Sequence, residues 1–222
     1  MISAVDAIER LREGNRCFVN EEGKTDRLSN HAQRARLVDG QNPFAIVLAC
    51  SDSRVPVEMI FNQGIGDLFV IRVAGNVVAP SQVGSVEYAA TQLDTKLVVV
   101  LGHSNCGAVE ATLKELRREQ AHRSPNLRAI VDRIQPAIEP LLEQDDATSL
   151  NDAVVANVHR SVKRLCHGSI ILEELLESGE LTIVGAEYLM ESGEVTFLDA
   201  LEPGAEVVCA DGRLDANVCV TA

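Results

Sequence analysis

Three short apolar runs constrain the fold of this chain more than any other feature of its sequence. They cover residues 44–49 (FAIVLA), 68–73 (LFVIRV) and 97–102 (LVVVLG). Apolar runs of this length are typical of strands that are buried on both faces of a sheet. The segment 81–93, between the last two runs, is long enough for a helix. Buried strands that alternate with helices predict an α/β fold with a mostly parallel sheet and right-handed crossovers.

The sequence before and after these runs predicts helices and a final pair of strands. Residues 2–38 have the pattern of two helices with polar outer faces. The apolar positions at helical spacing are Val5, Ile8, Leu11 and Phe18. After His103 the chain is predicted to be mostly helical to about residue 178, and two strands then flank a Glu-Ser-Gly turn.

The chain is therefore predicted to form a single domain over residues 1–222, because no repeat or linker divides it. Within that domain we expect a helical arm at 1–40, an α/β core flanked by helices at 41–200 and a C-terminal tail at 201–222. Aromatic residues make up only 3% of the chain, so the core must consist mainly of Val, Leu, Ile and Ala.

The charge of the chain excludes some classes of partner. Its formal net charge of -13 argues against nucleic acid and against an anionic membrane surface, which both require basic faces. The N-terminal sequence has no apolar segment of signal-peptide or membrane-spanning type, so we expect a cytoplasmic protein. In that compartment the six cysteines are expected to bind metal or to be buried rather than to form disulfides.

Cys50, His103 and Cys106 have the chemistry of a zinc site. Cys50 follows the first predicted strand, and His103 follows the third. Because ligands bind beyond the carboxyl ends of parallel strands, these two side chains are expected to converge. Cys106 lies three residues after His103 and can bind the same ion. Two thiolates and an imidazole suit one Zn²⁺ per chain, and three protein ligands leave the fourth position for water, as in catalytic sites.

Asp52 and Arg54 are predicted to act beside this ion. In an extended chain they point in the same direction as Cys50, because alternate residues share a face. A bidentate hydrogen bond from Arg54 keeps Asp52 ionised and oriented, so Asp52 can accept a proton next to the metal. Alternatively, Asp52 binds zinc itself in an inactive form.

Three sequence blocks together resemble the β-class carbonic anhydrases. They are CSDSRVP at 50–56, GDLFVIRVAGN at 66–76 and GHSNCGA at 102–108, and the resemblance extends from about residue 11 to about residue 200. It implies reversible hydration of carbon dioxide to bicarbonate. It also implies zinc on Cys50, His103 and Cys106, with Asp52 and Arg54 as the catalytic pair.

The plant-like branch of this family, called type I, places a glutamine, a phenylalanine and a tyrosine around the substrate. Gln41, Phe69 and Tyr88 stand at the matching offsets, and Gly107 offers a close backbone approach. The resemblance further implies a homodimer or homotetramer, with the N-terminal arm packed on a neighbour and the site near the interface.

Two alternative functions remain open from the sequence. A related hydrolase that acts on carbonyl sulfide or carbon disulfide would use the same zinc site, although the CSDSR block is unaltered here. A zinc-stabilised sensor without catalysis would not need the pair of Asp52 and Arg54. Comparing turnover of carbon dioxide, carbonyl sulfide and carbon disulfide distinguishes the hydrolase from a carbonic anhydrase. The effect of Asp52→Asn on the hydration rate distinguishes the sensor from an enzyme.

Overall fold

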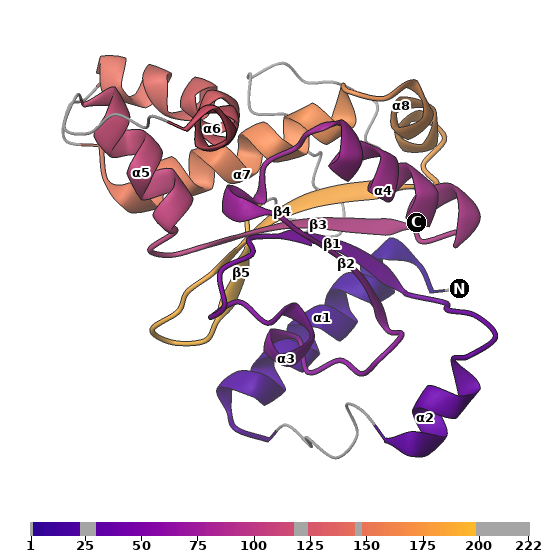
Figure 1. The fold of residues 1–222 in the computed structure, drawn as a ribbon. Helices are drawn as coiled ribbons and strands as arrows, with labels where there is room; N and C mark the ends of the chain where they lie inside the picture. Colours follow the sequence, from indigo (N-terminus) through magenta and orange to yellow (C-terminus); the bar gives the residue numbers. More distant parts are fainter. Residues whose placement is uncertain (1, 23–29, 118–123, 145–147, 199–222) are drawn as a thin grey trace.

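The computed structural model describes residues 2–22, 30–117, 124–144 and 148–198. Its five strands form one sheet in the order β2 (Leu68–Arg72), β1 (Ala45–Ala49), β3 (Leu97–His103), β4 (Thr182–Tyr188) and β5 (Val195–Phe197) (Figure 1). The first four strands are parallel, and β5 is antiparallel to β4. The predicted α/β fold with a mostly parallel sheet is confirmed. The predicted C-terminal tail, 201–222, lies outside the described residues.

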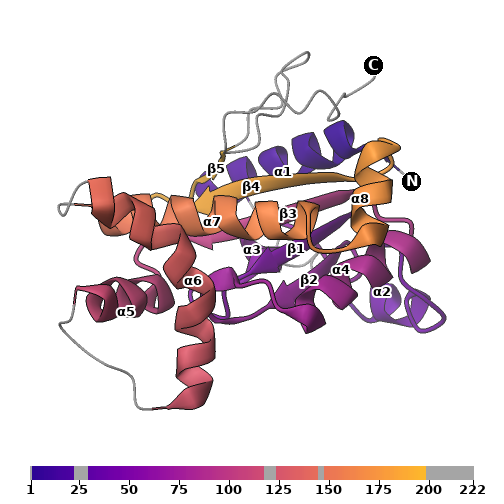
Figure 2. The ribbon, with the colours of Figure 1, turned by 90° about the horizontal axis from the view of Figure 1, so that it is seen from above.

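Helices cover both faces of the sheet (Figures 1 and 2). One face packs against α1 (Ala4–Val19) and α3 (Val57–Ile60). The other packs against α4 (Pro80–Gln92), α7 (Leu150–Cys166) and α8 (Ile170–Glu177). The remaining helices are α2 (His31–Arg36), η2 (Ala74–Asn76), α5 (Gly107–Leu116) and α6 (Pro125–Gln144). Among the described residues, no helix combines the length and apolar character needed to cross a bilayer.

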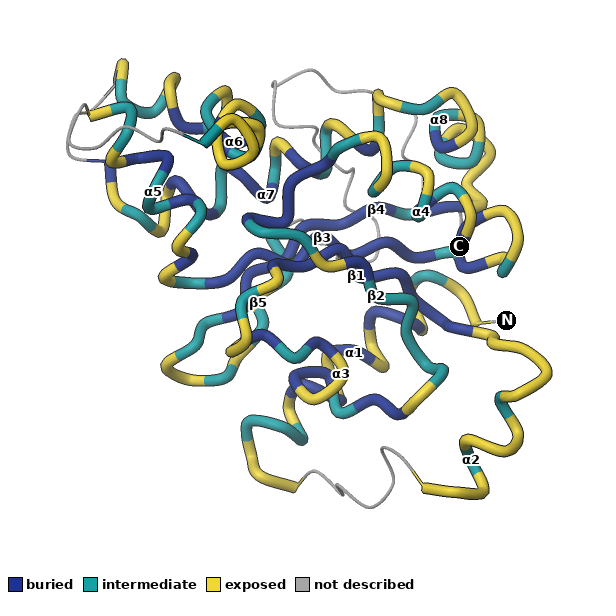
Figure 3. Tube along the Cα trace, viewed as in Figure 1, coloured by how far each residue is buried: buried dark blue, intermediate teal, exposed yellow. Residues whose placement is uncertain are grey.

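Small aliphatic side chains fill the core on both faces. All five residues of β1 are buried (Figure 3). Val47 belongs to the cluster under α1, whereas Ile46 and Leu48 belong to the cluster under α4 and α7. This division follows from the two-residue period of a strand. It explains why the runs that form β1 and β3 lack alternating polar residues, whereas β2 at the sheet edge is only partly buried and ends at Arg72.

The N-terminal arm is helical as predicted, but most of it packs within its own chain. Ile8 and Leu11 of α1 are buried against the sheet, whereas Val5 is 48% exposed. The Ser3 side chain caps the start of α1 by accepting a hydrogen bond from the Asp6 amide. By contrast, α2 buries none of its residues. Of the two helices described in the arm, α2 is the one with the exposure expected of a segment that reaches a neighbouring chain.

The parallel register brings the ends of β1 and β3 together. Ala49, the last residue of β1, lies opposite Leu101 of β3. Cys50 and His103 therefore emerge at the same edge of the sheet, even though the two are far apart in sequence.

Candidate metal centre and active site

Cys50, His103 and Cys106 form a buried cluster at the carboxyl edge of the sheet. One ligand atom from each residue lies within 4.8 Å of those from the other two. Cys50 follows β1, His103 ends β3, and Cys106 is the N-cap residue of α5. The convergence expected from the sequence is thus present in a single chain.

The two ring nitrogens of His103 have different environments. Nδ1 lies 2.9 Å from the Ser104 carbonyl oxygen, which can only accept, so Nδ1 carries the proton. Nε2 is buried and has no hydrogen-bond partner among the described residues. A buried acceptor without a partner is costly unless a ligand satisfies it. A metal on Nε2, with the other ring nitrogen held by a backbone carbonyl, is the usual arrangement in metalloproteins.

The two thiols also fit a cation. Hydrogen bonding with Cys106 is the main cause that lowers the pKa of Cys50, and the Gly75 amide contributes. The same contact with Cys50 raises the pKa of Cys106, since two adjacent buried thiolates repel each other. A divalent cation removes that conflict and allows both thiols to ionise. Two sulfur atoms and one imidazole nitrogen are a donor set that suits zinc.

Asp52 and Arg54 form the predicted bidentate pair. Arg54 Nε donates to Asp52 Oδ1 over 3.0 Å, and Arg54 Nη2 donates to Oδ2 over 2.8 Å. The Arg54 side chain is the main cause that holds the pKa of Asp52 far below its usual range. Asp52 is therefore an ionised hydrogen-bond acceptor, two residues after Cys50 in the chain.

The backbone around this pair differs from the extended conformation that the sequence suggested. The Arg54 amide donates to Asp52 Oδ1 over 2.9 Å, and the Val55 amide donates to the Asp52 carbonyl over 3.0 Å. These contacts define a tight turn that begins at Asp52, a role for which aspartate is well suited. The expectation of an extended chain was wrong, because it overlooked the ability of Asp52 to bond its own backbone.

Arg72 supports the segment that carries Cys50 and Asp52. Its Nε donates to the Cys50 carbonyl over 3.1 Å, and its Nη2 donates to the Asp52 carbonyl over 2.6 Å. Arg72 ends β2, the strand beside β1. Sequence reasoning did not assign it a role, although an arginine that ends an apolar strand signals a polar partner nearby.

The turn η2 supports Cys50 from the other side. The Gly75 amide donates to Cys50 Sγ over 3.3 Å. From α7, Asn157 Nδ2 donates to the Gly75 carbonyl over 2.8 Å, and Ser161 Oγ donates to the Asn76 carbonyl over 3.1 Å. Sequence reasoning missed both α7 residues. Their signal is weak: two small polar residues, one turn apart, on the apolar face of an amphipathic helix.

The proposed substrate residues lie in two places. Gly107, the first residue of α5, follows the ligand Cys106. Gln41 precedes β1, and Phe69 lies opposite Ile46 near the start of that strand. Tyr88 of α4 lies beside Phe69, with ring centroids 6.2 Å apart. Gln41, Phe69 and Tyr88 therefore lie toward the amino edge of the sheet, whereas the metal ligands lie at its carboxyl edge.

Comparison with known proteins identifies the family. Residues 45–195 match the family model described as carbonic anhydrase. The chain is 39% identical to carbonic anhydrase 2 of Mycobacterium tuberculosis, over 83% of this chain and 87% of that protein. It is 41% identical to a carbonic anhydrase of Mycolicibacterium smegmatis, over 83% of this chain and 88% of that protein.

Solved structures agree with this match. The β-carbonic anhydrase CcaA has a TM-score of 0.69 at 28% identity, covering 87% of this chain and 95% of that one. The β-carbonic anhydrase CafA of Aspergillus fumigatus has a TM-score of 0.66 at 29% identity, covering 90% and 92%. With the cysteine and histidine cluster and the five-stranded sheet, these likenesses show that the chain belongs to the carbonic anhydrase family, in its β class.

Proposed function

We propose that this chain is a zinc-dependent carbonic anhydrase that converts carbon dioxide and water reversibly into bicarbonate and a proton. One observation carries the proposal: a buried cluster of two cysteines and a histidine, with an unpartnered Nε2, lies beside a carboxylate held by arginine. Zinc with an open fourth position supplies a nucleophile made from water near neutral pH.

The residues of the chain then have separate tasks. Cys50, His103 and Cys106 hold the ion. Asp52 accepts a hydrogen bond at its carboxylate, and Arg54 keeps that carboxylate ionised and correctly oriented. This pairing orients the acceptor without a large rearrangement, since both oxygen atoms of Asp52 are already fixed.

The placement of the substrate residues supports a site shared between two copies. Within one chain, the proposed metal ligands lie at the carboxyl edge of the sheet. The amino edge, too far away to reach them, carries Gln41, Phe69 and Tyr88. However, β2 is an edge strand, and Tyr88 is 51% exposed. A homodimer formed along this edge, or a tetramer of such dimers, brings the aromatic residues of one copy to the metal of another. Phe69 and Tyr88 then provide an apolar wall for a nonpolar substrate, and Gln41 donates a hydrogen bond to bicarbonate.

The state of the cysteines supports action in the cytoplasm. Cys17, Cys50, Cys106 and Cys166 are all free thiols among the described residues. Free thiols persist in a reducing compartment, where they remain available for metal binding.

The test is stopped-flow hydration of carbon dioxide by the zinc-loaded full chain and by Asp52→Asn. The proposal predicts turnover by the wild type and a loss of about 100-fold or more in the variant, because Asn lacks the ionised acceptor that Arg54 holds in place. Parallel assays with carbonyl sulfide and carbon disulfide identify the hydrolase alternative. Equal and negligible hydration by both proteins would point to a zinc-stabilised sensor instead.

A further inference from the structure

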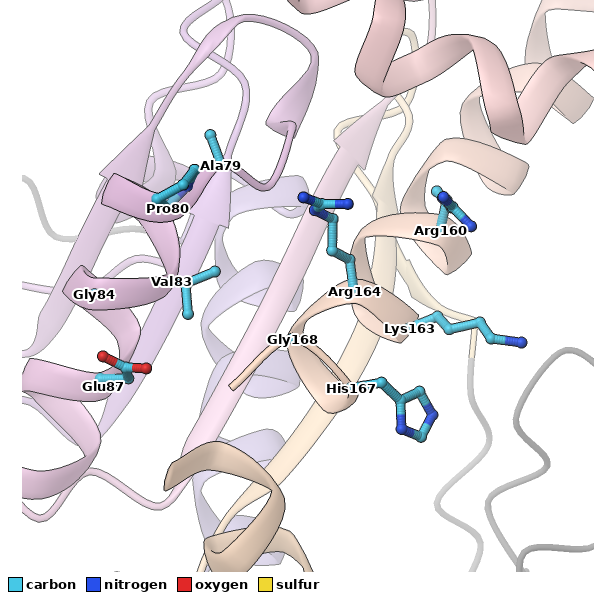
Figure 4. A pocket seen from close by; sticks show the side chains of 10 residues that line it. All are labelled: Ala79, Pro80, Val83, Gly84, Glu87, Arg160, Lys163, Arg164, His167 and Gly168. Atoms are coloured by element: carbon cyan, nitrogen blue, oxygen red, sulfur yellow. The ribbon is translucent and has the colours of Figure 1, made fainter. Parts of the chain in front are cut away.

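A cavity lies between α4 and α7, and none of the residues that line it belongs to the cluster of Cys50, His103 and Cys106. Its volume is about 560 Å³, within the range of small-molecule sites. The wall formed by α4 and its N-cap is mostly apolar, with Ala79, Pro80 and Val83. The opposite wall is basic, and Figure 4 shows the Arg164 side chain extending between the two helices.

The basic residues of this cavity share one face of α7. They are Arg160, Lys163, Arg164 and His167, which recur at spacings of three and four residues. Lys163 and Arg164 belong to the last turn, where the helix dipole favours cations. The dipole does not account for Arg160, which lies a turn earlier. Such a concentration of cations is unexpected in a chain with a net charge of -13.

The arginines of this cavity lack acidic partners. Among the described residues, neither Arg160 nor Arg164 forms an ion pair. The one acid in the wall is Glu87, whose Oε1 accepts a hydrogen bond from Ser169 Oγ over 2.5 Å. This single carboxylate cannot balance the charges of both arginines, and like charges that face a common space repel one another. An anionic ligand would relieve that repulsion.

A third arginine extends the basic surface. Arg133 of α6 lines a smaller neighbouring cavity of about 50 Å³ together with Arg160 and Arg164. Its Nε is buried and has no partner among the described residues. The carboxylate of Asp132 in the same lining is already paired with Arg128 over 2.6 Å. A buried guanidinium nitrogen without an acceptor is a second sign, independent of the charge pattern, that an anion belongs here.

We propose that the cavity between α4 and α7 binds a small molecule that carries phosphate groups. The guanidinium groups of Arg160 and Arg164 can each donate two parallel hydrogen bonds to phosphate oxygens. Arg133 adds further donors beside them. Pro80 and Val83 provide an apolar surface for the organic part of the ligand. The site is separate from the metal centre and does not depend on the reaction proposed above.

The experiment is calorimetric titration of the zinc-loaded full chain with pyrophosphate at constant ionic strength. Wild type is compared with the Arg160→Gln/Arg164→Gln double variant. Arg36→Gln on the exposed helix α2 is the control, since it removes one positive charge elsewhere. We expect saturable binding to wild type, affinity at least about tenfold lower in the double variant, and no change in the control.

A third variant tests the site by a gain of affinity. Glu87→Gln retains an acceptor for Ser169 but removes the one negative charge in the wall, so pyrophosphate should bind several-fold more tightly. Pyrophosphate bound at the metal would be insensitive to all of these changes. Failure to saturate wild type, or equal affinity in wild type and the double variant, would overturn the proposal.

Discussion

Asn157 of α7 and Gly75 of η2 are joined by a hydrogen bond of 2.8 Å from the asparagine Nδ2 to the glycine carbonyl. The Gly75 amide in turn donates to Cys50 Sγ. Helix α7 thus holds in place the backbone amide that donates to the sulfur atom of Cys50. Outer contacts of this kind orient ligands and tune metal sites.

The first prediction concerns this contact. Asn157→Asp replaces the donor with a carboxylate that repels the Gly75 carbonyl, so the turn should lose its support. We expect zinc affinity, measured by competition with a chelator, to fall by about 10- to 100-fold. Asn20→Asp, an equal charge change at the exposed end of α1, should leave it unchanged. Equal zinc affinities in the two variants would show that η2 is held without Asn157.

The second prediction concerns Arg54. Arg54→Lys keeps the positive charge but loses the fork that holds both oxygens of Asp52. Turnover in stopped-flow hydration should fall by about tenfold or more, while zinc content stays the same. Arg16→Lys, in an exposed pair with Glu13, is the matched control. A fully active Arg54→Lys enzyme would show that charge alone, without bidentate geometry, is sufficient.

The third prediction contrasts two glycines. Gly75 has a φ of +67°, and an added Cβ would lie 2.8 Å from Ile134 Cδ1. Gly75→Ala should therefore destabilise the protein by about 1–2 kcal/mol in urea unfolding. Gly84 lies inside α4 with nothing within 4 Å of an added Cβ. Gly84→Ala should stabilise by up to about 1 kcal/mol, because alanine is the better helix former. If both substitutions changed the free energy of unfolding in the same direction, this account would be contradicted.

The fourth prediction tests the shared site by complementation. Cys106→Ser removes a metal ligand, and a second variant, Phe69→Ala/Tyr88→Ala, removes the apolar wall. If the wall comes from another copy, unfolding and refolding the two inactive proteins together restores part of the hydration activity. In hybrid dimers, one intact metal site then faces one intact wall. Absence of recovery in dimers proven to be mixed would place the wall and the metal in the same chain.

The sequence was sufficient to predict the sheet and the convergence of Cys50 and His103 for a simple physical reason. The runs that became β1 and β3 are apolar because helices cover both faces of the sheet, whereas the edge strand β2 ends at the exposed Arg72. A parallel sheet necessarily brings the residues that follow its strands to one edge. Cys50 and His103 could therefore be placed together from their positions after two strands.

Other features of the site depend on contacts that no local pattern contains. Asn157 and Gly75 are 82 residues apart, and the approach of α7 to η2 follows from the packing of whole helices. The cavity with Arg160 and Arg164 likewise arises only when α4 and α7 lie side by side. The turn at Asp52 is local, but an extended segment was equally compatible with its sequence.

X-ray absorption at the zinc edge of the purified full chain tests the central claim most directly. The account predicts about one zinc per chain, bound by two sulfur atoms near 2.3 Å and by two lighter nitrogen or oxygen atoms near 2.0 Å. One of the lighter atoms is His103 Nε2, and the other belongs to the exchangeable water at the fourth position. A protein without zinc, or a zinc ion bound by any number of sulfur atoms other than two, would contradict it.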